Sequence, residues 1–192
     1  MEKNILLCGV GGQGTVLASR LIALAAMEKG LDARTAETIG MAQRGGSVFS
    51  HVRIGEQVFS PLIPYGQADA IIGFEPGETL RCFPYLKKDG VIVVSKKAVK
   101  PVTATLSTSD YDGSAEIAYL QQHHDKVVVF DTEEALKQCG SGKVLNVLLL
   151  GALIAHGDIG ITLEEMQHAI EKKVPERFRE LNQRALAIGA AL

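Results

Sequence analysis

The stretch LLCGVGGQGTVLAS, at residues 6–19, decides the fold that this sequence predicts. The mostly apolar residues 4–8 predict a short buried strand that ends in glycine. Apolar residues then recur at helical spacing, which predicts a helix over residues 15–29 that Gly30 ends. A strand, a glycine turn and a helix in this order form the opening unit of an α/β fold.

The turn itself matches the pattern G-x-G-x-x-G through Gly9, Gly11 and Gly14, and it also contains Gly12 and Gln13. The first glycine permits a tight turn, the second lets a phosphate approach the backbone, and the third lets helix and strand pack closely. The start of the helix offers N–H groups and a partial positive charge.

Two interpretations of this turn remain open at the level of the sequence. Glu37 follows the turn at about the distance of a ribose-binding carboxylate, which favours a ligand that contains ADP. The alternative is that a tight strand-to-helix crossover uses glycines for packing alone and holds no ligand.

The rest of the chain alternates in the same way. Strands are predicted at residues 32–38, 70–74, 91–95 and 127–130, and helices at 76–86, 114–123 and 132–138, with a turn at residues 89–90. Residues 47–54 alternate like a strand, and Gly55-Glu56 predicts a hairpin turn into residues 57–60. From residue 143 the chain reads as helical, with breaks at 157–160 and near Pro175. We expect an α/β fold, a mostly parallel Rossmann-like sheet with an antiparallel hairpin and a helical C-terminal third, in a single domain over residues 1–192.

The stretch ETIGMAQRGGSVFSHVR, at residues 37–53, is the second candidate site. Arg44 stands beside Gly45 and Gly46, so a guanidinium and free backbone amides could bind an anion together. The alternative is a structural loop in which Arg44 pairs with Glu37. His51 has no identifiable partner, so we do not expect it to be catalytic.

Composition excludes several classes of function. The net charge of −2 is made of scattered charges of both signs, which gives no electrostatic reason to expect a nucleic acid or an acidic membrane as partner. The sequence shows neither a signal peptide pattern nor an apolar stretch long enough to cross a bilayer, so we expect a cytoplasmic protein. Three separated cysteines are too few for an iron–sulfur cluster or a structural zinc site in this chain alone.

Taken together, GVGGQGTVLASRLIALAA at residues 9–26 and ETIGMAQRGGSVFSHVRIG at residues 37–55 resemble the gamma-type subunit of 2-oxoacid:ferredoxin oxidoreductases. That family includes the pyruvate, 2-oxoglutarate, 2-oxoisovalerate and indolepyruvate enzymes. The resemblance extends over nearly the whole chain, through ADAIIGFEP at 68–76, NVLLLGALIA at 146–155 and ERFRELNQRALAIG at 176–189.

The resemblance implies a division of labour among subunits. Enzymes of this family decarboxylate a 2-oxoacid on thiamine diphosphate and pass electrons through iron–sulfur clusters to ferredoxin, and most release an acyl-CoA. The thiamine diphosphate and the clusters would lie in partner subunits, so this chain would meet ferredoxin only indirectly, would carry no catalytic residue and would be inactive alone. Whether the isolated chain forms a homodimer is left open.

Three roles for the two glycine stretches follow from the resemblance. The Gly9–Gly14 turn and Arg44 would hold the diphosphate or the 3′-phosphate of CoA, or this surface would shape the active site of the partner subunits, or both would hold at a shared cleft. Two competing hypotheses are a free-standing NAD(P)-dependent oxidoreductase, based on the G-x-G-x-x-G turn with Glu37, and a CoA- or nucleotide-binding module without catalysis.

Overall fold

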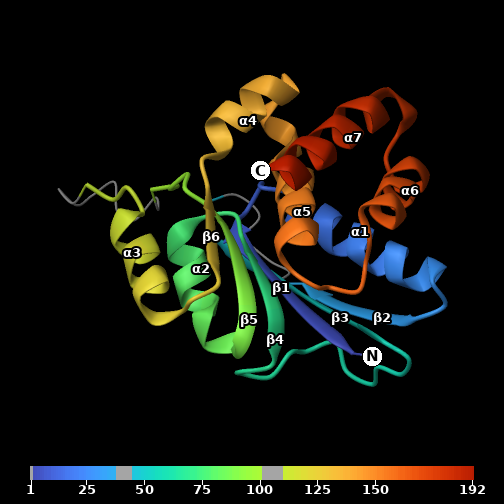
Figure 1. The fold of residues 1–192 in the computed structure, drawn as a ribbon, viewed down its shortest axis with the longest axis horizontal. Helices are drawn as coiled ribbons and strands as arrows, with labels where there is room; N and C mark the ends of the chain where they lie inside the picture. The colour runs from blue at the N-terminus through green and yellow to red at the C-terminus, as the bar shows by residue number, and fades with distance from the viewer. Residues whose placement is uncertain (1, 38–44, 101–109) are drawn as a thin grey trace.

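The computed structural model describes residues 2–37, 45–100 and 110–192. Its centre is a six-stranded sheet in the order β2-β3-β1-β4-β5-β6 (Figure 1). The strands are β1 Lys3–Val10, β2 Asp32–Glu37, β3 Ser47–Gly55, β4 Ala68–Gly73, β5 Leu86–Ser95 and β6 Val127–Phe130. Strands β1, β4, β5 and β6 are parallel, whereas β3 runs antiparallel to both β1 and β2. The predicted α/β sheet, mostly parallel with an antiparallel portion, is confirmed.

Helices cover both faces of the sheet (Figure 1). One face carries α1 Thr15–Glu28, α5 Leu145–His156, α6 Leu163–Lys173 and α7 Glu176–Ala191, and the other carries α2 Pro76–Cys82 and α3 Ser114–His123. Helix α4, Thr132–Cys139, leads into α5 through a short 3₁₀ turn at Gly142–Val144. Alternate residues of each central strand face opposite clusters, so that Ile5 and Leu7 pack toward α1 and α5, and Leu6 and Cys8 pack toward α2 and α3.

No single helix in the described ranges is long and apolar enough to cross a membrane. By length and composition alone, α4 taken together with Gly142–His156 would reach that measure, and these two segments meet at a bend of 114°.

Helices α5 and α7 touch backbone to backbone. A Cβ atom added at Gly189 of α7 would lie 1.9 Å from the carbonyl oxygen of Leu148, and one added at Gly151 of α5 would lie 2.2 Å from that of Leu186. Each position therefore requires glycine, because any side chain would force the helices apart. The first nine residues of α5 are all buried, and the close packing of α7 covers part of this helix.

The predicted hairpin through Gly55-Glu56 is wrong, because residues 57–60 form no strand and β3 pairs with β2 and β1 instead. After β3, side chains of β2 form the hydrogen bonds to the backbone of Val58 that a paired strand would otherwise provide. Val58 N donates to Asp32 Oδ2 at 3.3 Å, and Arg34 Nε donates to the Val58 carbonyl at 3.2 Å. Both backbone groups of Val58 are thus satisfied without a further strand.

The predicted helix over residues 76–86 and the predicted turn at 89–90 are also corrected. Helix α2 ends at Cys82, and a 3₁₀ turn with Pro84 at its second position, Phe83–Tyr85, precedes β5. Strand β5 then runs straight through Asp89 and Gly90, where the pairing of β4 with β5 has an irregularity. Gly90 lies so close to β4 that an added Cβ would be 3.0 Å from the Ala68 carbonyl, which explains the glycine without a turn.

Candidate functional site

The predicted glycine turn lies where the sheet changes the direction of its connections. Helix α1 follows β1 and packs on one face, whereas α2 follows the neighbouring strand β4 and packs on the other (Figure 1). In open α/β sheets, ligands bind outside the carboxyl ends of strands at such a switch point. The fold therefore places residues 9–14 at the position where ligand binding is most expected.

The side chain of Gln13 bridges the two strand ends at this point. Val10 N donates to Gln13 Oε1 at 2.7 Å, and Gln13 Nε2 donates to the Phe74 carbonyl at 3.1 Å. A Cβ atom added at Gly9 would lie 2.5 Å from Gln13 Oε1 and 2.7 Å from Phe74 Cβ. Gln13 and Phe74 thus occupy the space directly above Gly9, and they hold the ends of β1 and β4 together.

The second glycine stretch, at Gly45 and Gly46, lies in contact with the first, as a site shared by both stretches requires. Gly11 N donates to the Gly46 carbonyl at 2.9 Å, and Gly45 N donates to the Gly11 carbonyl at 3.4 Å. The amide of Gly11, predicted to approach a phosphate, is therefore engaged by the chain itself. Arg44, the cation of the predicted anion site, lies outside the described residues.

The start of α1 keeps the chemistry of an anion site. Gly14 is the N-cap, with φ of 86°, and supplies no side-chain hydrogen bond to the first turn of the helix. Gly12, with φ of 103°, is exposed, and no atom of the described residues lies within 4 Å of the position that a Cβ would take. The N–H groups at the start of α1 are thus the part of the turn best suited to a negatively charged group.

Glu37 ends β2 and contacts α1. Its carboxylate accepts a hydrogen bond from Ser19 Oγ at 3.1 Å and lies 3.8 Å from Arg20 Nε. Both contacts are made by Oε1 of Glu37 to residues of α1, so they hold the end of β2 against this helix. This local pairing uses the carboxylate that the dinucleotide hypothesis assigned to a ribose.

Asn146, in the first turn of α5, is a neighbour of the glycine turn that sequence reasoning missed. Its Nδ2 donates to the Gly14 carbonyl at 3.3 Å, and a Cβ added at Gly14 would lie 2.7 Å from that nitrogen. Asn146 is 3% exposed, and its Oδ1 has no hydrogen-bond partner within the described ranges. An asparagine in the motif-like stretch NVLLLGALIA is the only signal that the sequence offered for this contact.

A second missed group is Glu75, which follows β4 at the same edge of the sheet and is 2% exposed. Its carboxylate caps α2 by accepting from Glu78 N at 2.9 Å, and it also accepts from the hydroxyl of Tyr111. The Tyr111 hydroxyl in turn accepts from Gly77 N at 2.9 Å. Burial, and then the hydrogen bond to the Glu75 carboxylate, raise the pKa of Tyr111, so this phenol stays protonated and acts as a structural donor.

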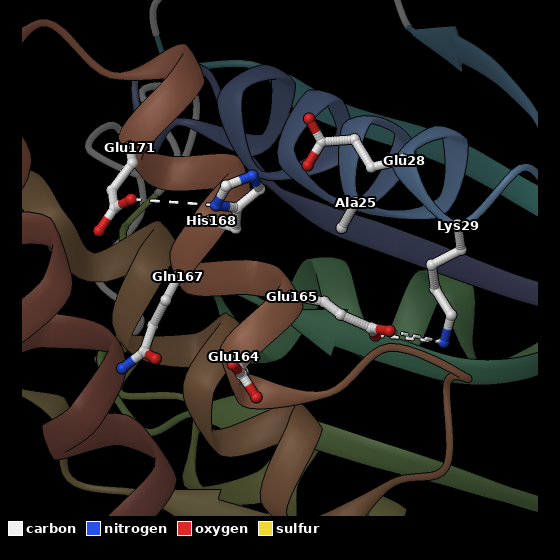
Figure 2. A pocket seen from close by; sticks show the side chains of 8 residues that line it. All are labelled: Ala25, Glu28, Lys29, Glu164, Glu165, Gln167, His168 and Glu171. Atoms are coloured by element: carbon white, nitrogen blue, oxygen red, sulfur yellow. Dashed lines mark hydrogen bonds and ion pairs between the residues drawn. The ribbon is translucent and has the colours of Figure 1, made fainter.

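A hollow of about 480 Å³ lies elsewhere, between the last turns of α1 and helix α6 (Figure 2). Lys29 pairs with Glu165 at 3.1 Å, and Nδ1 of His168 lies 3.9 Å from the Glu171 carboxylate. Dashed lines mark both pairs in Figure 2. The lining residues are Ala25, Glu28, Lys29, Glu164, Glu165, Gln167, His168 and Glu171. Among the residues that the structure describes, no group of His, Cys, Asp or Glu could hold a metal ion. This hollow is an ion-paired helix junction, about 16 Å along α1 from the glycine turn.

Comparisons with known proteins agree with this architecture. The family model described as pyruvate ferredoxin/flavodoxin oxidoreductase matches residues 4–192. The indolepyruvate oxidoreductase subunit IorB of Archaeoglobus fulgidus is 39% identical over 190 residues, which cover 98% of this chain and 94% of that protein. The IorB subunit of Pyrococcus horikoshii is 35% identical, with the same coverage.

Among solved structures, the gamma subunit of a keto/oxoacid ferredoxin oxidoreductase from Geobacter sulfurreducens has a TM-score of 0.71 at 27% identity. That match covers 97% of this chain and 95% of the other. The resemblance seen in the two glycine stretches is therefore confirmed: this chain belongs to the pyruvate ferredoxin/flavodoxin oxidoreductase family and is a homologue of the gamma-type subunits of multisubunit 2-oxoacid:ferredoxin oxidoreductases.

Proposed function

We propose that this chain is the gamma-type subunit of an oxidoreductase that acts on indolepyruvate or a similar arylpyruvate. The observation that carries the proposal is a difference in similarity. Four IorB subunits from different archaea are 35–39% identical over 98% of the chain. The pyruvate synthase subunit of Methanosarcina barkeri and the 2-oxoglutarate synthase subunit of Methanothermobacter thermautotrophicus are 27% and 26% identical.

In this proposal the partner subunits carry the thiamine diphosphate and the iron–sulfur clusters. The chemistry of the cysteines supports that division, because all three are buried as free thiols. Burial raises the pKa of the Cys8 and Cys139 thiols, which opposes the thiolate form that a cluster ligand needs.

Reconstitution tests this proposal. The chain purified alone should not reduce ferredoxin with any 2-oxoacid, and addition of its thiamine- and cluster-bearing partner should produce activity with indolepyruvate above that with pyruvate or 2-oxoglutarate. Equal activity of the partner without this chain would reject the subunit role. Activity restored with pyruvate as the preferred substrate would reject only the substrate class.

We further propose that the carboxyl edge of the sheet faces a cleft shared with the partner and holds a phosphate group of CoA there. The uncapped start of α1 and the exposed Gly12 support this role, together with the charge of Arg44. The engaged amides of Val10 and Gly11 restrict the contact to the helix start.

Replacement of Arg44 tests the CoA contact in the assembled enzyme. Loss of a charge-assisted contact in Arg44→Ala should weaken CoA binding by about 1.5–3 kcal/mol, measured by calorimetry. Arg20→Ala is the matched control, because Arg20 is exposed on α1 and pairs with Glu37. Parallel titrations with CoA and with dephospho-CoA decide between the 3′-phosphate and the diphosphate. Equal affinities for the wild type and Arg44→Ala would reject an anion role for Arg44.

The free-standing NAD(P)-dependent enzyme is disfavoured by two contacts. Gln13 bridges the strand ends at the switch point, and Glu37 is already paired with Ser19 and Arg20. Calorimetry of the isolated chain with millimolar NADH and NADPH should therefore detect no binding.

A further inference from the structure

Asn146 is a polar residue in a helix start that is otherwise apolar. The first nine residues of α5 are all buried, and among them Asn146 carries the one polar side chain. It is 3% exposed, and its Oδ1 has no hydrogen-bond partner in the part of the chain that the structure describes. A buried acceptor without a partner destabilises the folded state, and an alanine at this position would carry no such cost. The stability of α5 therefore does not explain why an amide stands here.

The nitrogen of this amide binds the glycine turn. Asn146 Nδ2 donates to the Gly14 carbonyl at 3.3 Å, and the same carbonyl accepts from Ala18 N at 3.2 Å. The amide group also lies directly against the backbone, because a Cβ added at Gly14 would be 2.7 Å from Nδ2 and 3.1 Å from Cγ of Asn146. Asn146 therefore holds the residue that forms the N-cap of α1.

The Gly14 carbonyl belongs to the same peptide unit as the first N–H group of α1. Gly14 is the N-cap and Thr15 is the first residue of the helix. A trans peptide unit is planar, so its C=O and N–H groups point in opposite directions. Glycine rotates about its backbone bonds more freely than other residues, and the hydrogen bond from Asn146 limits that rotation. By holding the carbonyl toward α5, Asn146 fixes the direction of the Thr15 N–H at the helix start.

The contact also joins two helix starts that lack negative charge of their own. Acidic residues occupy the first turn of α2, α3, α4, α6 and α7, but they occupy the first turn of neither α1 nor α5. Within the described residues, no side chain caps the start of either helix. The positive ends of two helix dipoles thus meet without a carboxylate from either first turn. A neutral amide between them leaves this positive potential available to a bound anion.

The residue type fits a role beside an anion. Asparagine presents an NH₂ donor on a short side chain and adds no charge. An aspartate would have the same shape and would suit the dipole at the start of α5. Its carboxylate, however, would face the Gly14 carbonyl and would repel a nearby phosphate. The unpaired Oδ1 is then a consequence of using a neutral amide as the donor.

We propose that Asn146 is a positioning residue for phosphate binding, because its hydrogen bond to the Gly14 carbonyl aims the Thr15 N–H at a phosphate group of CoA. The inference rests on the proposed function for the identity of this anion. Asn146 acts through the backbone of α1, since its Nδ2 is engaged by Gly14 and its Oδ1 is buried.

The test compares two buried asparagines in the chain assembled with its thiamine- and cluster-bearing partner. Asn146→Ala removes the contact with Gly14. The matched control is Asn182→Ala, because Asn182 is 6% exposed and its Nδ2 donates at 2.8 Å to the Phe178 carbonyl of its own helix, α7. In Asn146→Ala the KM for CoA should rise about tenfold, the effect of misplacing one hydrogen bond to a charged group. Its kcat and its KM for the 2-oxoacid should stay within about twofold of the wild type, and so should all three constants of the control.

Urea unfolding of each isolated variant establishes that it is folded. If Asn146→Ala unfolds, Asn146→Asp replaces it, and its KM for CoA should rise by at least as much. An unchanged KM for CoA in a folded Asn146 variant would overturn the inference, and so would an equal rise in Asn182→Ala. A lower kcat with a higher KM for the 2-oxoacid would overturn it in favour of a general structural role.

The same measurements separate this inference from the proposed function. If Arg44→Ala weakens CoA binding and Asn146→Ala does not, the positioning role alone is rejected. If the wild-type enzyme turns over without CoA, the proposed CoA contact is rejected and the positioning role is rejected with it.

Discussion

At the carboxyl end of the parallel strands, side chains pack directly against glycine backbone. At the amino end, side chains of β3 form hydrogen bonds to the backbone of the loop that follows it. Around the glycine turn, Gln13 and Asn146 contact backbone atoms directly beside Gly9 and Gly14. Beyond Gly55, the side chains of Arg53 and His51 bind the backbone of the following loop. The first end should therefore be sensitive to added atoms, and the second to lost hydrogen bonds and to pH.

The largest effect is expected from an added side chain at the carboxyl end. Gly9→Val should lower the free energy of unfolding by about 3 kcal/mol, because its Cβ would overlap Gln13 Oε1 and Phe74 Cβ in a buried site. The measurement is urea unfolding of the purified chain. In Gly12→Ala the new Cβ meets no atom of the described residues, so its positive φ is the expected cost, about 1 kcal/mol. Equal losses in the two variants would show that the end of β1 is not closely packed.

An intermediate effect is expected from loss of the arginine at the amino end. Arg53→Met keeps an unbranched apolar stem but removes hydrogen bonds to Asn4, Ser60 and Leu62 and the ion pair with Glu2. The free energy of unfolding should fall by about 2 kcal/mol.

The matched control for this change is Arg81→Met, because Arg81 is exposed on α2 and pairs with Glu78 only at its surface. Its cost should remain below about 0.5 kcal/mol. Faster proteolysis within residues 57–67 of Arg53→Met would locate the loss in the loop, and unchanged proteolysis there would contradict the bracing role.

The smallest effect is expected from acid. Burial lowers the pKa of His51, and the neutral ring accepts the Ile63 N–H through Nδ1. The unfolded chain binds a proton near pH 6.5, so stability is complete above that pH and falls as the pH drops below it. Between pH 7 and pH 5.5 the free energy of unfolding should fall more steeply in the wild type than in His51→Gln, as measured by urea unfolding at each pH. If the free energy of unfolding changed with pH in the same way in both proteins, His51 would not be the group that makes stability depend on pH.

Local patterns in the sequence were sufficient for most elements of the fold. The helix Ser114–His123 and the strand Val127–Phe130 have the predicted bounds, because their patterns are interrupted by polar or glycine residues at both ends. The strand predicted at residues 57–60 does not form, and the reason lies in contacts with residues distant in the sequence. Asp32 and Arg34 lie on a strand more than twenty residues earlier, and they bind the backbone of Val58 that a ladder would otherwise have used.

The sequence singled out both glycine stretches, and the structure brings Gly11 of the first to Gly46 of the second. The other contacts around the turn were not predicted. The bridge from Gln13 to Phe74 spans 61 residues, and the contact of Asn146 with Gly14 spans 132. Contacts of this range depend on how the strands and helices are ordered in space, which the sequence pattern of one element does not encode.

The glycine contact between α5 and α7 has a consequence for how the chain is made. Gly151 and Gly189 let two helices meet without intervening side chains, and α5 is almost wholly apolar. During synthesis, α5 is made before residues 176–191. The apolar face of α5 that packs against α7 therefore stays exposed until α7 is complete. Newly made polypeptide should therefore need protection from a chaperone over this interval.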